Sequence, residues 1–315
     1  MLGHSQVNHS LEAARERLKT SRKVTFFGGA GVSTASGIPD FRSATGLYNQ
    51  KTGSRYSPET MLSHNFFVHH PDEFYAFLRS SLYYPDAKPN AAHYVLAQME
   101  EKGKLNAVIT QNIDGLHQQA GSKVVYELHG SLKRFYCMRC HRAYQAERVY
   151  SQDTTPYCEV CGGLVRPDVV LYGELLDPDV LNASIAAIRE ADCMIVGGSS
   201  LVVYPAAGLL DYFRGDCLIL INREPTPYDH LAQFVFHDDI GEVLTEISCD
   251  LEVKKHHRHR ERSSLCPQNR VWRSVFVCIS WRPSVRSRAR SEDRHDHSRH
   301  RDVSVTARSD AIYLR

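Results

Sequence analysis

The chain has 315 residues, of which 42% are hydrophobic, and its 38 Lys and Arg against 36 Asp and Glu give a net charge of +2. This length corresponds to one large domain or two ordinary ones, and the composition is that of a globular protein. No run approaches the roughly 18 apolar residues of a membrane span, and the N-terminus lacks the basic and apolar regions of a secretory signal. These features argue against a membrane protein and favour a cytoplasmic location.

Short apolar segments alternate with segments of helix length over the first 250 residues. Residues 11–20 carry apolar side chains at helical spacing, and 23–27 form a predicted strand that leads into the glycines at 28–31. Further strands are expected at 105–110, 124–128, 169–172, 193–196, 217–221 and 234–236, and helices at 90–102, 178–190 and 205–214. Strands that alternate with helices and are apolar along their whole length indicate a parallel sheet that is covered on both faces. The predicted fold class is therefore α/β, a Rossmann-like doubly wound parallel sheet.

The composition changes near residue 254. Fifteen Lys and Arg against six Asp and Glu give residues 255–315 a charge of +9, which leaves −7 for the rest of the chain. Most of this segment lacks apolar periodicity, so it can bury little surface. A basic, disordered tail is therefore expected at 255–315.

The first motif is the segment 29–42, which follows the first predicted strand. Glycines at this point let the backbone approach a pyrophosphate, and the N-terminus of a following helix favours anionic charge. A glycine-rich turn alone is equally consistent with a plain tight turn.

Polar residues also follow other predicted strands, at 110–117, 197–206 and 221–224. Ligands bind at the carboxyl ends of strands in doubly wound sheets. By itself the first segment could be a capped helix start, with Asn112 or Asp114 as the N-cap, and the others could be ordinary loops. His129 follows the strand at 124–128, and an imidazole that titrates near neutral pH suits a general base.

The cysteines form one clear pattern. Cys137-x-x-Cys140 is followed, after seventeen residues, by Cys158-x-x-Cys161. Two such pairs at this separation indicate a zinc site rather than four redox cysteines, and four thiolates leave no position for a catalytic water. The predicted zinc is therefore structural. A zinc module can also bind nucleic acid, but this one lies inside the α/β region.

Together and in this order, the motifs resemble the sirtuin family of NAD-dependent protein-lysine deacylases, in its bacterial type, over about residues 10–250. The continuation of the glycine turn through Gly37-Ile-Pro-Asp-Phe-Arg42 carries most of the specificity. Gly28 is a small departure, because many relatives have Thr or Ser there. The resemblance implies a catalytic domain at 10–250, with a helical insertion at about 43–92 and a zinc module at about 131–166.

The resemblance also implies the site residues. His129 and Asn112 are the expected catalytic residues, and Cys137, Cys140, Cys158 and Cys161 the expected ligands of one structural Zn²⁺. The acyl-lysine peptide is expected to pair with the extended segment formed by Val170, Leu171, Tyr172 and Gly173. The co-substrate NAD is expected to contact Gly29, Ala30, Gly31, Thr34, Asp40, Phe41, Arg42, Gln111, Asn112, Ile113, Asp114, His129, Gly198, Ser199, Ser200, Asn222, Arg223 and Ile240.

In the implied reaction, the acetyl oxygen of the substrate attacks C1′ of the nicotinamide ribose and nicotinamide leaves. His129 then accepts a proton through the ribose hydroxyls, and the products are lysine and O-acetyl-ADP-ribose. The expected partners are proteins that carry acetylated lysine. The acidic body argues against nucleic-acid binding through the folded domain, and the chain is expected to be a monomer.

The acyl preference is a further expectation. Sirtuins that prefer succinyl or malonyl groups carry a Tyr-x-x-Arg pair in the acyl pocket, where the Arg binds the acyl carboxylate. The matching positions here are Tyr75 and Leu78. Arg79 is one residue late, which on a helix directs it about 100° away. An apolar acyl pocket that prefers short, uncharged acyl groups is therefore expected.

Two other functions remain open at this point. A mono-ADP-ribosyltransferase would use the same NAD site with a protein nucleophile in place of the acetyl oxygen. A non-catalytic module could instead bind nucleic acid or protein through the zinc module and the basic tail. Nicotinamide release that depends on acetyl-lysine would distinguish the deacetylase from both.

Overall fold

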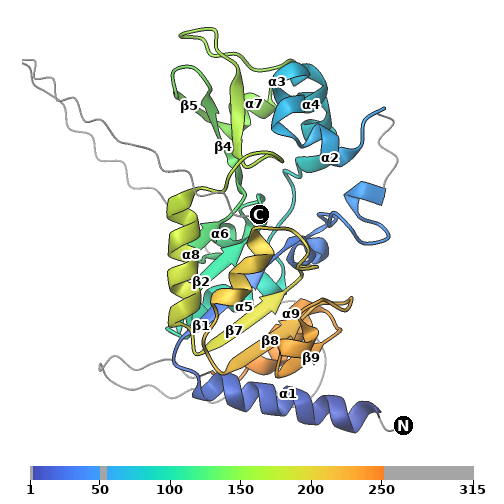
Figure 1. Cartoon of the computed structure of the whole chain (residues 1–315), viewed down its shortest axis with the longest axis vertical. Coiled ribbons are helices and arrows are strands. Elements are labelled where there is room, and N and C mark those ends of the chain that lie inside the picture. Colours follow the sequence, from blue (N-terminus) through green and yellow to red (C-terminus); the bar gives the residue numbers. More distant parts are fainter. Residues whose placement is uncertain (1–2, 50–54, 252–315) are drawn as a thin grey trace, which may run out of the picture. The chain divides into compact units, whose positions relative to one another are not determined.

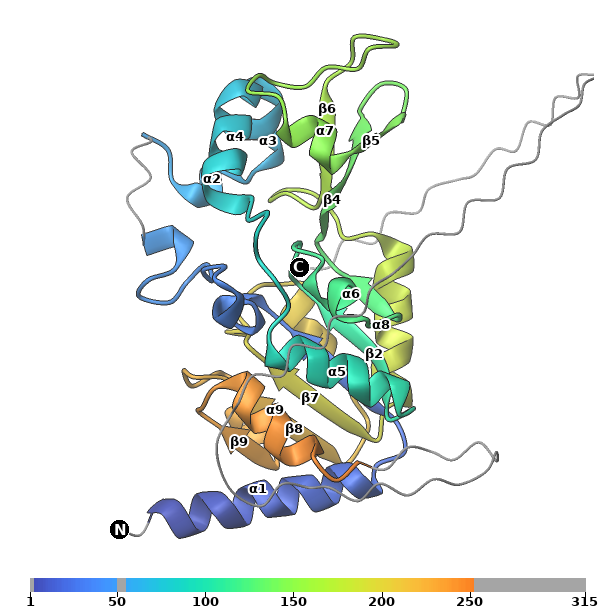
Figure 2. The same cartoon turned by 180° about the vertical axis from the view of Figure 1, so that it is seen from behind.

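The computed structural model describes residues 3–49 and 55–251 (Figures 1 and 2). The basic tail expected at 255–315 lies outside the described residues. Within them, no helix combines the length and the apolar character that crossing a bilayer requires.

A six-stranded parallel sheet forms the centre of the fold, in the order β3-β2-β1-β7-β8-β9. Every residue of β1, β7 and β8 is buried, as expected for strands covered on both faces. The α/β class and the doubly wound parallel sheet are confirmed. The strands are β1 (Val24–Gly28), β2 (Leu105–Thr110), β3 (Val125–Glu127), β7 (Cys193–Gly197), β8 (Cys217–Ile221) and β9 (Phe234–Phe236).

Helices cover both faces of this sheet. On one face α1 (Gly3–Thr20), α5 (Ala91–Glu101) and α9 (Ile240–Ser248) pack against alternate strand residues such as Phe26; α5 and α9 lie in front of the sheet in Figure 2. On the other face α8 (Pro178–Glu190) packs against residues such as Phe27. Beside α8, Ala206–Tyr212 forms a 3₁₀ helix where a regular helix was expected at 205–214. A short helix, α6 (Leu116–Ala120), contacts α5.

A second, three-stranded antiparallel sheet contains β4 (Gly130–Cys137), β5 (Ala143–Gln145) and β6 (Val165–Val169), with the short helix α7 (Ala146–Tyr150) beside it. The prediction that 169–172 is a strand of the parallel sheet is wrong. The strand ends at Val169, and Tyr172 makes only an isolated bridge with Ser63. An apolar run predicts burial, but its partner depends on where the chain returns after the zinc-binding loops.

The segment expected to be a helical insertion contains α2 (Pro58–Met61), α3 (His64–His69) and α4 (Pro71–Phe77), followed by one π-helical turn at Leu78–Leu82. The hydroxyl oxygens of Ser57 and Ser63 cap α2 and α3. These helices and the small sheet share one apolar core, and they lie side by side in both views (Figures 1 and 2).

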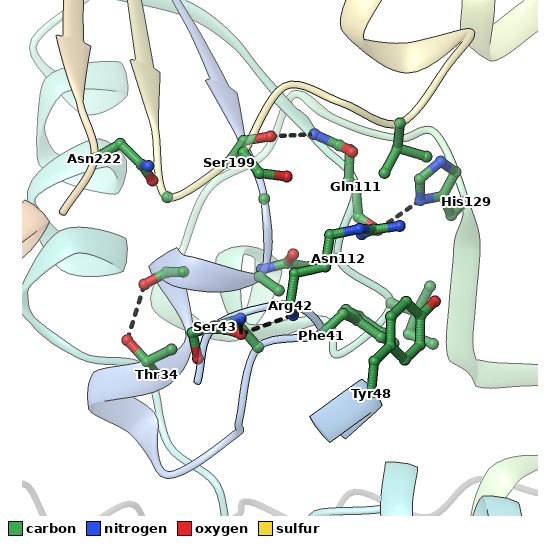
Figure 3. A pocket seen from close by; sticks show the side chains of 18 of the residues that line it. Thr34, Phe41, Arg42, Ser43, Tyr48, Gln111, Asn112, His129, Ser199 and Asn222 are labelled. Atoms are coloured by element: carbon green, nitrogen blue, oxygen red, sulfur yellow. Dashed lines mark hydrogen bonds between the residues drawn. The ribbon is translucent and has the colours of Figure 1, made fainter. Parts of the chain in front are cut away.

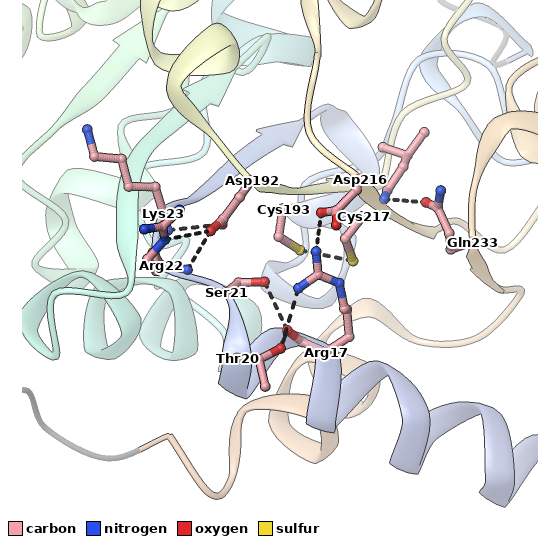
Figure 4. Close-up of polar contacts among 11 residues, drawn as sticks. Arg17, Thr20, Ser21, Arg22, Lys23, Asp192, Cys193, Asp216, Cys217 and Gln233 are labelled. Atoms are coloured by element: carbon pink, nitrogen blue, oxygen red, sulfur yellow. Dashed lines mark hydrogen bonds and ion pairs between the residues drawn. The ribbon is translucent and has the colours of Figure 1, made fainter.

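At the other end of the sheet, Asp192 holds the chain that leads into β1 (Figure 4). Its carboxylate accepts hydrogen bonds from the backbone N–H groups of Arg22 and Lys23, at 2.8 and 3.0 Å. The next residue, Cys193, lies opposite Cys217 in the sheet, and the two buried sulfur atoms are 3.3 Å apart. The start of β1 is thereby fixed beside the start of β7.

We expect Asp192→Ala to lower the free energy of unfolding by about 1.5 kcal/mol, because it removes a charged acceptor shared by two backbone donors. Urea unfolding followed by circular dichroism measures the change. The control is Glu190→Ala, which removes only the exposed ion pair with Lys23 Nζ and should cost well under about 1 kcal/mol. Equal losses in the two variants would contradict the role given to Asp192.

Candidate functional site

A pocket of about 570 Å³ opens at the carboxyl ends of β1, β2, β7 and β8 (Figure 3). These ends bring the glycine turn after β1 next to the polar segments after the other three strands, as expected for a doubly wound sheet. The pocket continues past His129 to the segment that follows β6. It therefore joins a compartment on the parallel sheet to one beside the small sheet.

The structure brings nearly all of the expected site residues together. Every residue expected to contact NAD except Asp114 lines the pocket, and so do Val170, Leu171, Tyr172 and Gly173. Asp114 lines a neighbouring cavity of about 90 Å³ together with Ser33 and Asn112. It accepts a hydrogen bond from Ser33 Oγ at 2.7 Å, and this hydroxyl in turn accepts one from Asn112 Nδ2 at 3.1 Å. Asp114 thus lies at a cavity that shares Asn112 and Ile113 with the pocket.

The glycine turn packs directly against the loop after β7. The N–H of Gly31 donates to the carbonyl of Gly198 at 2.8 Å. A Cβ on Gly31 would lie 2.7 Å from Gly198 Cα, and Gly198 itself has a φ of +59°. Only glycine allows so close an approach, so both glycines form the floor of the pocket.

The helix expected after this turn is absent from the structure. Ala30–Val32 and Thr34–Ser36 instead form two 3₁₀ turns, and Gly37 ends the second in the left-handed conformation. The expectation that a helix N-terminus favours an anion here is therefore wrong. The N–H groups of Gly29 and Gly31 donate to the carbonyls of Gly197 and Gly198, so the turn contributes its lack of side chains here rather than a helix dipole.

His129 lies on the pocket wall with one ring nitrogen already engaged. Its Nδ1 lies 3.0 Å from the carbonyl oxygen of Gln111. A carbonyl only accepts hydrogen bonds, so Nδ1 carries the proton and the neutral ring has an unprotonated Nε2. Burial lowers the pKa of His129 below its ordinary value, and the hydrogen bond to Gln111 opposes this only in part. The ring is therefore neutral at pH 7 and able to accept a proton.

The two polar residues before Ile113 are also fixed. Gln111 Nε2 donates to Ser199 Oγ at 3.0 Å, which links the ends of β2 and β7 (Figure 3). Asn112 is buried. The helix that follows has Gly115 as its N-cap, so Asn112 does not cap it. Asn112 lines the pocket instead.

His117, the last residue of the polar segment 110–117, lies in the core rather than in the pocket. His117 is buried in the core, with its ring centroid 4.7 Å from that of His93. Burial lowers the pKa of His117 to about 3 and that of His93 to about 4. Neither ring lines the pocket, which leaves His129 as the histidine of the site within the described residues.

Several lining residues were not identified from the sequence. The group from the segment after Arg42 includes Ser43 and Tyr48, and other members come from loops after β7 and β8 and from the two residues before α9. For Asp239 a signal existed, because Asp239 and Glu242 have the spacing of a capped helix start. Its carboxylate accepts from the N–H groups of Gly241 and Glu242. No sequence periodicity marks the others as lining residues.

The positions compared for acyl preference do not lie where the sequence placed them. Tyr75 and Leu78 are buried in the core shared by the helices and the small sheet, and Tyr75 donates to the carbonyl of Val165 at 2.6 Å. Neither lines the pocket; from this stretch only Leu82 does so. Arg79 points away, as expected, and donates to the carbonyls of Asp153 and Thr154.

The four paired cysteines form one cluster. Their sulfur atoms all lie within 4.8 Å of one another, with 3.4 Å between Cys137 and Cys161 and 3.6 Å between Cys140 and Cys158. A tetrahedral Zn²⁺ with Zn–S bonds of about 2.3 Å separates its sulfur ligands by about 3.8 Å. The cluster therefore fits one zinc ion. None of these cysteines lines the pocket, so the ion would be structural.

Comparisons with known proteins agree with this site. A family model described as "Sir2 family" matches residues 29–205. The chain is similar to a protein named NAD-dependent protein deacetylase from Clostridium acetobutylicum, with 58% identity over 228 residues that cover 72% of this chain and 93% of the relative.

Two solved structures show the same likeness. One is a Sir2 protein with a deacetylated p53 peptide and 3′-O-acetyl-ADP-ribose, with 41% identity, a TM-score of 0.70, and coverage of 76% of this chain and 98% of that one. The other is Sir2Tm bound to a propionylated peptide, with 41% identity, a TM-score of 0.67 and the same coverage.

Proposed function

The chain belongs to the Sir2, or sirtuin, family, and we propose that it removes acetyl groups from protein lysine side chains with NAD as co-substrate, releasing nicotinamide and O-acetyl-ADP-ribose. The observation that carries this proposal is the state of His129. Its neutral ring, with Nδ1 bonded to Gln111, presents an unprotonated nitrogen in a pocket that also holds the glycine turn. A base in that position suits proton removal from a bound ribose.

The other lining residues support binding of a dinucleotide. NAD carries a pyrophosphate and two riboses, and the pocket offers a glycine turn at Gly29–Gly31 that allows close approach to the backbone, with hydroxyls at Ser199 and Ser200. Asn222 stands at the end of β8, where it would meet the adenosine ribose. When bound, NAD supplies an electrophilic C1′, and the protein supplies position and a proton acceptor.

The peptide compartment is the second part of the proposal. Val170 N–H donates to the carbonyl of His129 at 3.0 Å, so the segment expected to bind peptide is joined directly to the proposed base. Tyr172 and Leu175 are exposed. An extended acyl-lysine peptide that pairs with this segment would place its side chain beside His129.

The test measures nicotinamide release with and without an acetyl-lysine peptide. Release that requires the acetylated peptide, with O-acetyl-ADP-ribose identified by mass spectrometry, supports the proposal. Release with unmodified protein and attachment of ADP-ribose to that protein would instead indicate a mono-ADP-ribosyltransferase. The absence of nicotinamide release under both conditions would contradict NAD chemistry at this site.

We expect acetyl-lysine peptide to be turned over at least about tenfold faster than succinyl-lysine peptide, the factor that corresponds to about 1.4 kcal/mol. The apolar residues Leu62, Leu82 and Leu171 line the pocket, and a succinyl carboxylate placed against these side chains would lose hydration without gaining a hydrogen bond from them. Steady-state kcat/KM for matched peptides measures the ratio.

The control for acyl preference is a propionyl peptide, which adds one methylene without charge and should react nearly as well as the acetyl peptide. Comparable kcat/KM for succinyl and acetyl peptides would contradict an uncharged acyl compartment. Arg42 also lines the pocket, so a selective loss of succinyl turnover in the neutral variant Arg42→Gln would then show that this cation binds the acyl carboxylate.

A further inference from the structure

Two tyrosines and an arginine form a hydrogen-bonded cluster across the pocket, between its two compartments. Tyr48 Oη and Tyr172 Oη are 2.7 Å apart, and Arg42 Nη2 donates to Tyr172 Oη at 3.4 Å. The Arg42 guanidinium also lies 5.1 Å from the centre of the Tyr48 ring, a cation–π distance. Arg42 and Tyr48 belong to the segment after the glycine turn, and Tyr172 belongs to the peptide-binding segment.

The Tyr172 side of this cluster is firmly held. The backbone of Tyr172 exchanges hydrogen bonds with both sides of Ser63, donating to the carbonyl of Leu62 and accepting from His64 N–H, each at 3.0 Å. The neighbouring N–H of Leu171 donates to Glu174, whose carboxylate forms a two-point ion pair with the buried Arg166. Tyr172 therefore offers its hydroxyl from a fixed backbone.

The other side is a loop whose residues are hydrogen-bonded to one another. Tyr48 N–H donates to the carbonyl of Phe41 at 2.9 Å, and Leu47 N–H donates to that of Asp40 at 2.8 Å. The Asp40 carboxylate accepts from Arg42 N–H, and the Phe41 and Tyr48 rings are 5.5 Å apart. Through these contacts, an interaction that fixes Tyr48 also fixes the positions of Phe41 and Arg42, which line the NAD compartment (Figure 3).

The chemistry of the hydroxyl pair favours a lasting bond. Burial raises the pKa of Tyr48 well above its ordinary value, and the hydrogen bond with Tyr172 raises it further. Tyr48 therefore keeps its proton and remains able to donate. A phenylalanine at either position would keep the ring and lose this bond, and at position 172 it would also remove the hydrogen bond from Arg42 Nη2.

We propose that the Tyr172 hydroxyl is a positioning group, which holds the loop from Asp40 to Tyr48 in its NAD-binding conformation through Tyr48 and Arg42. The inference rests on the proposed deacetylase function and extends it. Ordering the loop before NAD binds removes part of the entropic cost of binding. NAD affinity therefore depends on a residue of the peptide compartment.

The test compares wild type with Tyr172→Phe, Tyr48→Phe and the double variant. One hydrogen bond is worth about 0.5–1.5 kcal/mol, so each single variant should raise the KM for NAD about two- to tenfold. At saturating NAD, kcat should stay within about twofold, because the ordered loop is then restored by NAD itself. The double variant should match Tyr172→Phe, because the bond that Tyr48→Phe removes is already absent there.

Tyr94→Phe is the control, since Tyr94 is an exposed tyrosine on α5 outside the pocket; its KM for NAD should equal that of wild type. An unchanged KM for NAD in Tyr172→Phe, or additive effects in the double variant, would overturn the inference while wild-type activity still supports the function. A wild type without acetyl-lysine-dependent activity would overturn both. A fall in kcat alone, without a change in KM, would show that the hydroxyl does not act on NAD binding.

Discussion

Replacing His129 with alanine is expected to reduce deacetylation by about 10²- to 10⁴-fold, the usual contribution of one general base. The reason lies in the fixed tautomer: Nδ1 donates to Gln111, and only Nε2 is able to accept a proton in the pocket. The Gln111 side chain donates to Ser199, and because an amide is not a base, Gln111 does not replace the imidazole. The measurement is kcat for an acetyl-lysine peptide at saturating NAD.

The matched control is His230→Ala, which removes an exposed histidine outside the pocket and should leave kcat unchanged. Binding of NAD to His129→Ala, measured by calorimetry, should persist, because the glycine turn and the hydroxyls remain. Loss of both NAD binding and folding would show that His129 has a structural role instead.

The pH profile gives an independent check on the same residue. The folded-state pKa of His129 is lowered, so the base stays unprotonated down to below its ordinary value of 6.5. Activity should therefore be level around pH 7 and fall only at lower pH, as Nε2 gains a proton. An acidic limb centred above 6.5 would mean that another group controls the reaction.

The central sheet could be predicted because each of its strands is marked by a pattern within its own short stretch of sequence. The central strands β1, β7 and β8 are buried on both faces, so their sequences are continuous apolar runs that are readable without knowledge of their partners. Polar residues follow those runs, and the topology of a parallel sheet brings them to one edge. The strand pattern therefore placed the pocket at this edge of the sheet, whereas its individual residues came from the resemblance to the family, and several lining residues were missed.

The features that could not be predicted depend on contacts between residues that are far apart in the sequence. The run at 169–172 is apolar because it borders the core of the small sheet, and its pairing with β4 is visible only once the zinc loops are folded. Tyr75 and Leu78 have the spacing of an acyl-pocket pair, yet a π turn begins at Leu78 and both side chains are buried elsewhere. The Tyr48–Tyr172 pair joins residues 124 positions apart.

Removing the zinc ion is expected to abolish activity although the ion takes no part in the chemistry. The two strands that carry the cysteine loops run directly into the site: β4 begins at Gly130, beside His129, and β6 ends at Val169, beside Val170. Gly130 and Val169 are paired in the sheet. Structural zinc contributes about 10–16 kcal/mol of apparent binding free energy in zinc-finger peptides. A small three-stranded sheet that loses this free energy is not expected to stay folded.

Cys158→Ser should therefore lower the zinc content from one ion per chain to near zero and reduce kcat/KM by more than about 10²-fold, a loss that corresponds to roughly 2.7 kcal/mol. Hydrogen exchange should rise in β4, β5 and β6 and stay unchanged in β1 and β7, because the large sheet has its own core. Zinc analysis, peptide kinetics and exchange measured on the same sample separate these effects. The control is Cys249→Ser, which changes an exposed cysteine outside the cluster and should alter none of the three.

Metal replacement decides between a structural and a catalytic ion. Cobalt(II) bound by four thiolates has the same tetrahedral coordination geometry as zinc. Wild type reconstituted with cobalt should therefore recover nearly all of its activity and show the same pH profile as the zinc form. A catalytic metal lowers the pKa of its own bound water, and exchanging it would shift that profile. Full activity in metal-free protein, or a profile that moves with the metal, would contradict a structural ion whose effect reaches His129 only through β4 and β6.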